Sequence, residues 1–91
     1  MRAVKANGGS KLKYSYDLKY DIFWAYVESG FADAEELAED IFVEFKDGRV
    51  VGVEIHDASK ILGEYWKEPE KAAERAMEIA KRLASVQMVK G

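Results

Sequence analysis

The chain has 91 residues, a net charge of −3 and no cysteine. A chain of this length forms one domain, and the lack of cysteine excludes disulfides, cysteine-ligated zinc, iron–sulfur clusters and thiol nucleophiles. No stretch approaches the roughly 20 apolar residues that a membrane span needs, and residues 1–10 contain no apolar run typical of a signal peptide. We therefore expect a soluble cytoplasmic protein.

Charged residues make up 34% of the chain, whereas side-chain amides are limited to Asn7 and Gln87. Abundant lysine and glutamate with few thermolabile residues is a pattern typical of hyperthermophiles, so the composition favours a thermophile as the source. Alternatively, the composition of so short a chain reflects chance.

The charges are distributed unevenly along the chain. Residues 1–13 carry four cations and no acid. Residues 28–47 carry one cation, Lys46, and eight carboxylates: Glu28, Asp33, Glu35, Glu36, Glu39, Asp40, Glu44 and Asp47. An acidic stretch repels nucleic-acid phosphates and attracts a basic partner. The alternative is a solvated loop whose charges only promote solubility.

The first elements are predicted from their hydrophobic patterns. Residues 1–10 are rich in glycine near their end and are expected to form a flexible arm ahead of a single α+β domain over residues 11–91. Residues 11–16 alternate apolar and polar side chains, which indicates a half-buried strand. Residues 22–27 are apolar on both faces, so this strand is either covered twice or meets another subunit. On that basis we predict a homodimer.

The next segment, residues 28–40, is ambiguous. Asp33 and Glu36 have the spacing of a capping box, and the alanines and Leu37 favour helix. One or two helical turns over residues 33–39 are therefore plausible, with an extended acidic loop as the alternative.

Residues 41–56 are predicted to form a β-hairpin that turns at Lys46-Asp47-Gly48. A two-residue turn at Asp47-Gly48 would mix apolar and charged side chains on both faces. Register follows the buried face, so we predict a three-residue loop with Gly48 left-handed in a bulge. The apolar face then contains Ile41, Val43, Phe45, Val51, Val53 and Ile55.

The C-terminal part is predicted to be helical. Asp57 is expected to cap a segment over residues 58–62 that ends at Gly63, and Tyr65 and Trp66 are expected to anchor this corner on the sheet. Pro69 fits the first turn of a helix over residues 70–86. Its apolar stripe contains Ala73, Ala76, Met77, Ala80, Leu83 and Ala84. The predicted fold is a four-stranded antiparallel meander with this helix packed on one face.

Recognisable catalytic chemistry is sparse. His56 is the only histidine, so a two-histidine metal site cannot form within one chain, and no phosphate-binding or cofactor motif occurs. We predict no enzymatic activity and no cofactor. Two polar clusters support the alternative of a small metal-dependent enzyme or hydrolase: Asp17 with Asp21, and Glu54 with His56, Asp57 and Ser59. The simpler interpretation is that the aspartates and Ser59 hydrogen-bond nearby backbone or cap the following turn.

The aromatic side chains have few basic neighbours outside the arm. We therefore assign them to the core and a subunit interface rather than to a base-stacking platform. Nucleic-acid binding through the basic N-terminal arm is the third alternative for function.

Several short stretches together resemble a known family. They are Tyr16-Asp17, Asp21, Tyr26, residues 40–45, residues 48–55 and Asp57-Ala58-Ser59. Over residues 12–62 the chain resembles the YuzE-like family of small uncharacterised prokaryotic proteins. The resemblance implies a small β-sheet with helical additions, an extended acidic middle and no established activity.

Some members of that family look like partners of small toxin-like proteins, which implies an antitoxin-like or binding role. Combined with the charge pattern, this favours a non-enzymatic protein-interaction module with a basic protein partner. The candidate interaction surface is Glu35, Glu36, Glu39 and Asp40.

Overall fold

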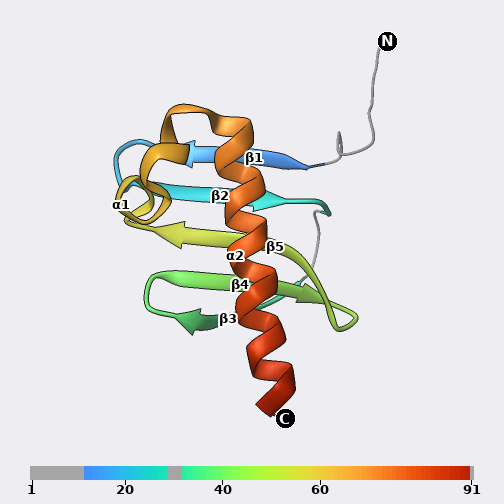
Figure 1. Cartoon of the computed structure of the whole chain (residues 1–91). Helices are drawn as coiled ribbons and strands as arrows, with labels where there is room; N and C mark the ends of the chain where they lie inside the picture. Colours follow the sequence, from blue (N-terminus) through green and yellow to red (C-terminus); the bar gives the residue numbers. More distant parts are fainter. Residues whose placement is uncertain (1–11, 29–31, 91) are drawn as a thin grey trace.

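The computed structural model describes residues 12–28 and 32–90, with side chains described as far as Val86. Five strands form one antiparallel sheet: β1 (Lys13–Asp17), β2 (Ile22–Tyr26), β3 (Asp33–Ala38), β4 (Ile41–Lys46) and β5 (Arg49–His56). The short helix α1 (Ala58–Leu62), the 3-10 turn η2 (Gly63–Lys67) and the long helix α2 (Pro69–Lys90) follow. Helix α2 crosses all the strands on one face of the sheet (Figure 1). The predicted arm over residues 1–10 lies outside the described residues.

The predicted α+β class and the C-terminal helix are confirmed, but the four-stranded meander is wrong. The strand order is β1-β2-β5-β4-β3, so β5 lies between β2 and β4. Burial explains this order, because Val51, Val53 and Ile55 of β5 are at most 1% exposed. Such a strand is best covered at the centre of a sheet, whereas β1 and β3, which contain no fully buried residue, take the edges.

Strand β3 replaces the helical turns considered for residues 33–39. It pairs with β4 from Asp33↔Phe45 to Ala38↔Ile41, and the register shifts between Glu36 and Ala38. This pairing gives the backbone its hydrogen bonds and overrides a weak helix propensity. Leu37 and Ala38 pack against the core, and this contact fixes the C-terminal end of β3. The extended middle implied by the family resemblance is therefore correct.

The hairpin between β4 and β5 has a two-residue turn, so the predicted three-residue loop is wrong. Lys46 pairs with Arg49, and both Asp47 and Gly48 have positive φ, at 54° and 79°. Positive φ at both central positions is the geometry that matches the twist of paired strands. The register then shifts by one residue between Glu44 and Phe45, which leaves Val51 as the extra residue. Through this bulge, rather than through a longer loop, the predicted apolar residues become buried or half-buried, and Val50, which pairs with Phe45, also packs against the core.

The core lies between the sheet and α2. The alanine-rich stripe of α2 is buried against β2 and β5, and the small side chains allow the helix to approach the strands closely. Trp66 packs its ring 4.1 Å from that of Tyr16 and 6.1 Å from that of Phe23. Tyr65 is 46% exposed, so of the two predicted anchors only Trp66 docks on the sheet.

Over the described ranges, neither α1 nor α2 has the length and apolarity needed to cross a membrane.

Candidate functional site

Asp21 joins the turn between β1 and β2 to the start of α1. Its backbone is left-handed, with φ 55°, and its carbonyl accepts the backbone N–H of Ala58 at 3.0 Å. The carboxylate accepts the Ser59 N–H at 3.1 Å, the Ser59 hydroxyl at 2.8 Å and the Tyr16 hydroxyl at 2.8 Å. We call Tyr16, Asp21 and Ser59 the clamp. It ties together segments that are 38 residues apart.

The clamp corrects the expected role of Asp57. Asp57 occupies the N-cap position of α1, but its side chain makes no capping hydrogen bond. Asp21 supplies that bond from outside the helix. Asp17 accepts the backbone N–H of Tyr20 at 3.1 Å, which is the local turn interaction considered for it. Asp17 and Asp21 therefore have structural roles.

The hydrogen bonds of the clamp shift two pKa values. Burial tends to raise the pKa of Asp21, but the hydrogen bonds from Ser59 and Tyr16 outweigh it and lower the pKa below the ordinary 3.8. Burial raises the pKa of Tyr16, and its hydrogen bond to Asp21 raises it further. Both shifts favour the pair seen in the fold, a charged carboxylate with a neutral phenol.

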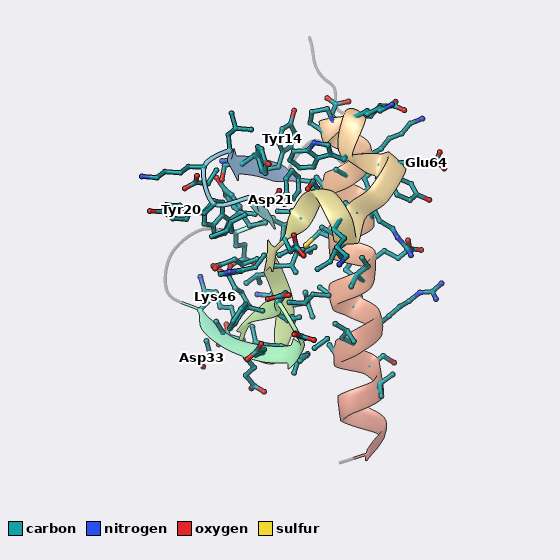
Figure 2. The ribbon with its side chains drawn as sticks, turned by 90° about the vertical axis from the view of Figure 1, so that its left-hand side faces the viewer. Tyr14, Tyr20, Asp21, Asp33, Lys46 and Glu64 are labelled. Carbon is teal, nitrogen blue, oxygen red and sulfur yellow. The ribbon has the colours of Figure 1, made fainter. Side chains whose placement is uncertain are left out.

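The face of the sheet opposite α2 carries a second cluster. In Figure 2, α2 packs on one side of the sheet, and Tyr20 and Lys46 project on the other. Cross-strand pairing places one row of side chains across this face: Glu36, Phe42, Glu54, Trp24 and Ser15. A neighbouring row contains Ala34, Glu44, Gly52, Tyr26 and Lys13. We call these two rows, with Ile22 and His56, the open face.

Glu54 lies at the centre of the open face. Its Oε1 accepts the indole N–H of Trp24 at 3.0 Å, and its Oε2 lies 2.5 Å from Nε2 of His56. The ring of His56 stacks at a tilt against Phe42, with 5.1 Å between centroids. The sequence placed Glu54 and His56 together correctly. Asp57 and Ser59 belong instead to the start of α1, where Ser59 bonds Asp21, so the four-residue cluster considered as the alternative does not form.

Glu44 also lies on this face, although the candidate cluster predicted from the sequence did not include it. It pairs with Gly52, and a Cβ built on that glycine would lie 2.5 Å from Oε1 of Glu44. The carboxylate therefore fills the space that a side chain at position 52 would take. Burial raises the pKa of Glu44, and the negative charge of Glu54 raises it further. A glycine inside an alternating strand was the available signal, because it often marks a close approach.

The predicted interaction surface lies at the edge strand. Glu35 and Glu36 of β3 and Glu39 of the following turn are exposed, and Asp40 is half-buried. Asp40 is left-handed, with φ 69°, and its carbonyl accepts the His56 N–H at 2.8 Å. We call Glu35, Glu36, Glu39 and Asp40 the acidic edge. Glu28 lies apart from it and pairs with Lys46 at 3.4 Å and Arg49 at 3.1 Å.

The residues of the metal-dependent alternative do not converge. Asp17 and His56 are separated by Ile22 across the sheet, and Asp21 is engaged in the clamp. In the part of the chain that the structure describes, no group of three or more histidine, aspartate or glutamate side chains could hold a metal ion.

Comparison with known proteins identifies a family of unknown function. A family model described as "Protein of unknown function (DUF2283)" matches residues 13–59, which is more than half of the chain. No curated protein and no solved structure matches. The matched segment includes all five strands, the clamp and the open face, but not α2. The chain therefore belongs to the DUF2283 family.

Proposed function

We propose that this protein is a non-enzymatic interaction module that binds a basic protein segment along the acidic edge. The observation that carries the proposal is that β3 is an edge strand of the sheet and exposes Glu35 and Glu36. An antitoxin-like role in the cytoplasm, with a small basic protein as the partner, is the physiological form that we propose.

An edge strand offers backbone groups as well as charge. On its outer side β3 pairs with no other strand of residues 12–28 and 32–90, so its free N–H and C=O groups can pair with an added strand. Glu35 and Glu36 are adjacent in the strand and therefore point to opposite faces. A partner strand with lysine or arginine on both faces would meet a carboxylate on each side.

Charges on an edge strand have a second effect, because they discourage unwanted pairing between copies of the same protein. This effect is compatible with the proposal. Two acidic edges repel each other, whereas an acidic edge attracts a basic strand. The same residues therefore favour a basic partner over a second copy of the protein.

The test is the affinity for a fluorescent peptide of alternating lysine and threonine, measured by anisotropy. Reversing Glu35, Glu36 and Glu39 to lysine should weaken binding by at least about tenfold, since each lost charge pair contributes up to about 1 kcal/mol. The matched control reverses Glu64, Glu70 and Glu74, which are exposed on η2 and α2. Equal loss in both variants, or no loss in either, would contradict the proposal.

A further inference from the structure

We propose that the open face binds a cationic side chain of the basic partner, an arginine or a lysine, between the ring of Trp24 and the carboxylates of Glu44 and Glu54. The inference rests on the proposed function and deepens it, because it assigns a second contact surface and the side-chain chemistry that this surface recognises.

The first support is the alternation of acids and aromatic rings across the strands. In the row Glu36, Phe42, Glu54 and Trp24, each side chain is the direct cross-strand neighbour of the next. Side chains in such pairs stand about 4.5–5.5 Å apart at Cβ. A cation placed on this face can therefore contact a ring and a carboxylate at once, which combines cation–π attraction with an ion pair.

The second support is that, among the described side chains, neither Glu44 nor Glu54 forms an ion pair with a lysine or arginine. Lys46 and Arg49, the nearest along the chain, both pair with Glu28, and Lys13 lies at the far end of the Glu44 row, on β1. The ion-pair partner of Glu54 within the described residues is His56. Burial raises the pKa of Glu44, and the negative charge of Glu54 raises it further, so the two neighbouring carboxylates repel each other. A guest cation would relieve that repulsion.

The third support is the room that Gly52 leaves for the Glu44 carboxylate at the centre of the face. A side chain at this position would fill the space that the carboxylate now occupies, and its Cβ would also lie 3.1 Å from Cβ of Tyr26. The missing side chain therefore lets the carboxylate lie over β5, on the same face as Glu54. A cationic side chain complements two carboxylates in this position better than an apolar surface does.

A second copy of this chain is a poorer occupant. Packing two open faces together around a two-fold axis would bring four buried carboxylates, Glu44 and Glu54 from each copy, towards one another without a cation. Burying unpaired charge is costly. The homodimer predicted from the second apolar face of β2 stays a prediction, and a dimer that covers this face is one outcome of the test.

The two tryptophans provide the experiment. Trp24 lies on the open face, whereas Trp66 of η2 packs against Tyr16, Phe23 and the core, so their indole N–H resonances report on opposite sides of the sheet. A blocked octa-arginine peptide is titrated into the ¹⁵N-labelled full chain. The inference predicts a saturable shift of the Trp24 indole and an unmoved Trp66 indole.

Conservative variants identify the groups responsible. Glu54→Gln retains an oxygen that can accept the Trp24 indole N–H, and Glu44→Gln retains the shape of the side chain. Each variant should therefore leave the fold intact and weaken binding of the octa-arginine peptide at least tenfold. Glu74→Gln removes a charge on α2 and should leave the affinity within twofold.

The outcomes separate this inference from the proposed function. Glu36 belongs to both surfaces, so Glu44→Gln and Glu54→Gln decide the outcome. If the edge reversal weakens binding of the octa-arginine peptide while these two variants do not, the inference is wrong and the acidic edge stands. If these two variants weaken binding and the edge reversal does not, the inference stands and the acidic edge fails. A Trp24 indole that does not move with peptide, or that moves with protein concentration alone as a dimer forms in light scattering, overturns the inference.

Discussion

The carboxylate of Asp21 accepts hydrogen bonds from both the backbone N–H and the hydroxyl of Ser59. Through this relationship a turn between the first two strands caps a helix that begins after the last strand. His56, at the end of β5, pairs with Ile22, the residue that follows Asp21. The clamp therefore fixes the end of the open face, although none of its members belongs to that face.

Replacing Asp21 with asparagine should destabilise the fold. Asparagine tolerates the left-handed backbone as aspartate does, so the change isolates the charge and one hydrogen bond. We expect a loss of about 1 kcal/mol in the free energy of unfolding, the usual scale for such a bond. The matched control is Asp57→Asn, since Asp57 has φ 57° but no side-chain cap. Urea unfolding should show the control within about 0.5 kcal/mol of wild type; equal effects would contradict the role of the clamp.

The contribution of Asp21 should depend on pH. Its pKa is lowered in the fold from the ordinary 3.8, so the unfolded chain binds its proton more readily. The stabilisation is fully present above that ordinary value and is lost as pH falls through the lower folded value. The stability difference between wild type and Asp21→Asn should therefore shrink as the pH is lowered below 3.8. A difference that stays constant into that acidic range would argue against the hydrogen bonds as its cause.

Glu44→Gln should stabilise the protein at neutral pH. Burial and the charge of Glu54 raise the pKa of Glu44 above the ordinary 4.5, so the fold favours the protonated form, and wild type loses stability as pH rises through that range. Like charges on adjacent strands cost roughly 0.2–1 kcal/mol, and we expect a gain of that size. Chemical denaturation should show the gain at neutral pH and near-identity to wild type below 4.5. If Glu44→Gln instead destabilised the protein at neutral pH, the prediction would be contradicted, because the charged carboxylate would then be stabilising the fold.

Two glycines separate backbone strain from crowding. Gly48 and Gly63 both have positive φ, and a Cβ at either position would meet nothing within 4 Å. Gly63 has ψ −128°, a combination with positive φ that side chains rarely adopt, whereas Gly48 lies in a two-residue turn. We expect Gly48→Ala to cost about 1 kcal/mol and Gly63→Ala to cost about 1–3 kcal/mol. Thermal unfolding that ranks them in the reverse order would refute this explanation.

The hairpin illustrates what could be predicted from the sequence and what could not. The buried set Ile41, Val43, Val53 and Ile55 followed from alternation, since one face must be apolar. The feature that sets the register could not be predicted from the sequence, because a three-residue loop and a bulge within the strand both shift the register by one residue. The bulge after a two-residue turn depends on how β5 pairs with β2 as well as with β4, and that pairing joins distant segments.

The candidate site was predicted in part for the same reason. Glu54 and His56 are two residues apart on one strand, so period-two alternation brought them together. Glu44 joins them only across strands, and its burial depends on the missing side chain of Gly52. The capping of α1 by Asp21 was equally hidden, since local spacing pointed to Asp57. Contacts that follow from alternation along a strand or within one hairpin were predictable, whereas contacts that depend on a missing side chain or on segments distant in the sequence required the fold.

The most direct test of the central claim, that this module binds a basic segment through its acidic edge, is an amide NMR titration of the full chain with the lysine–threonine peptide. We predict that the largest shifts fall on β3, the Glu39-Asp40 turn and β4, and that they shrink as salt is raised because exposed charges are screened. Shifts that are absent, or that centre on α2, would contradict the claim.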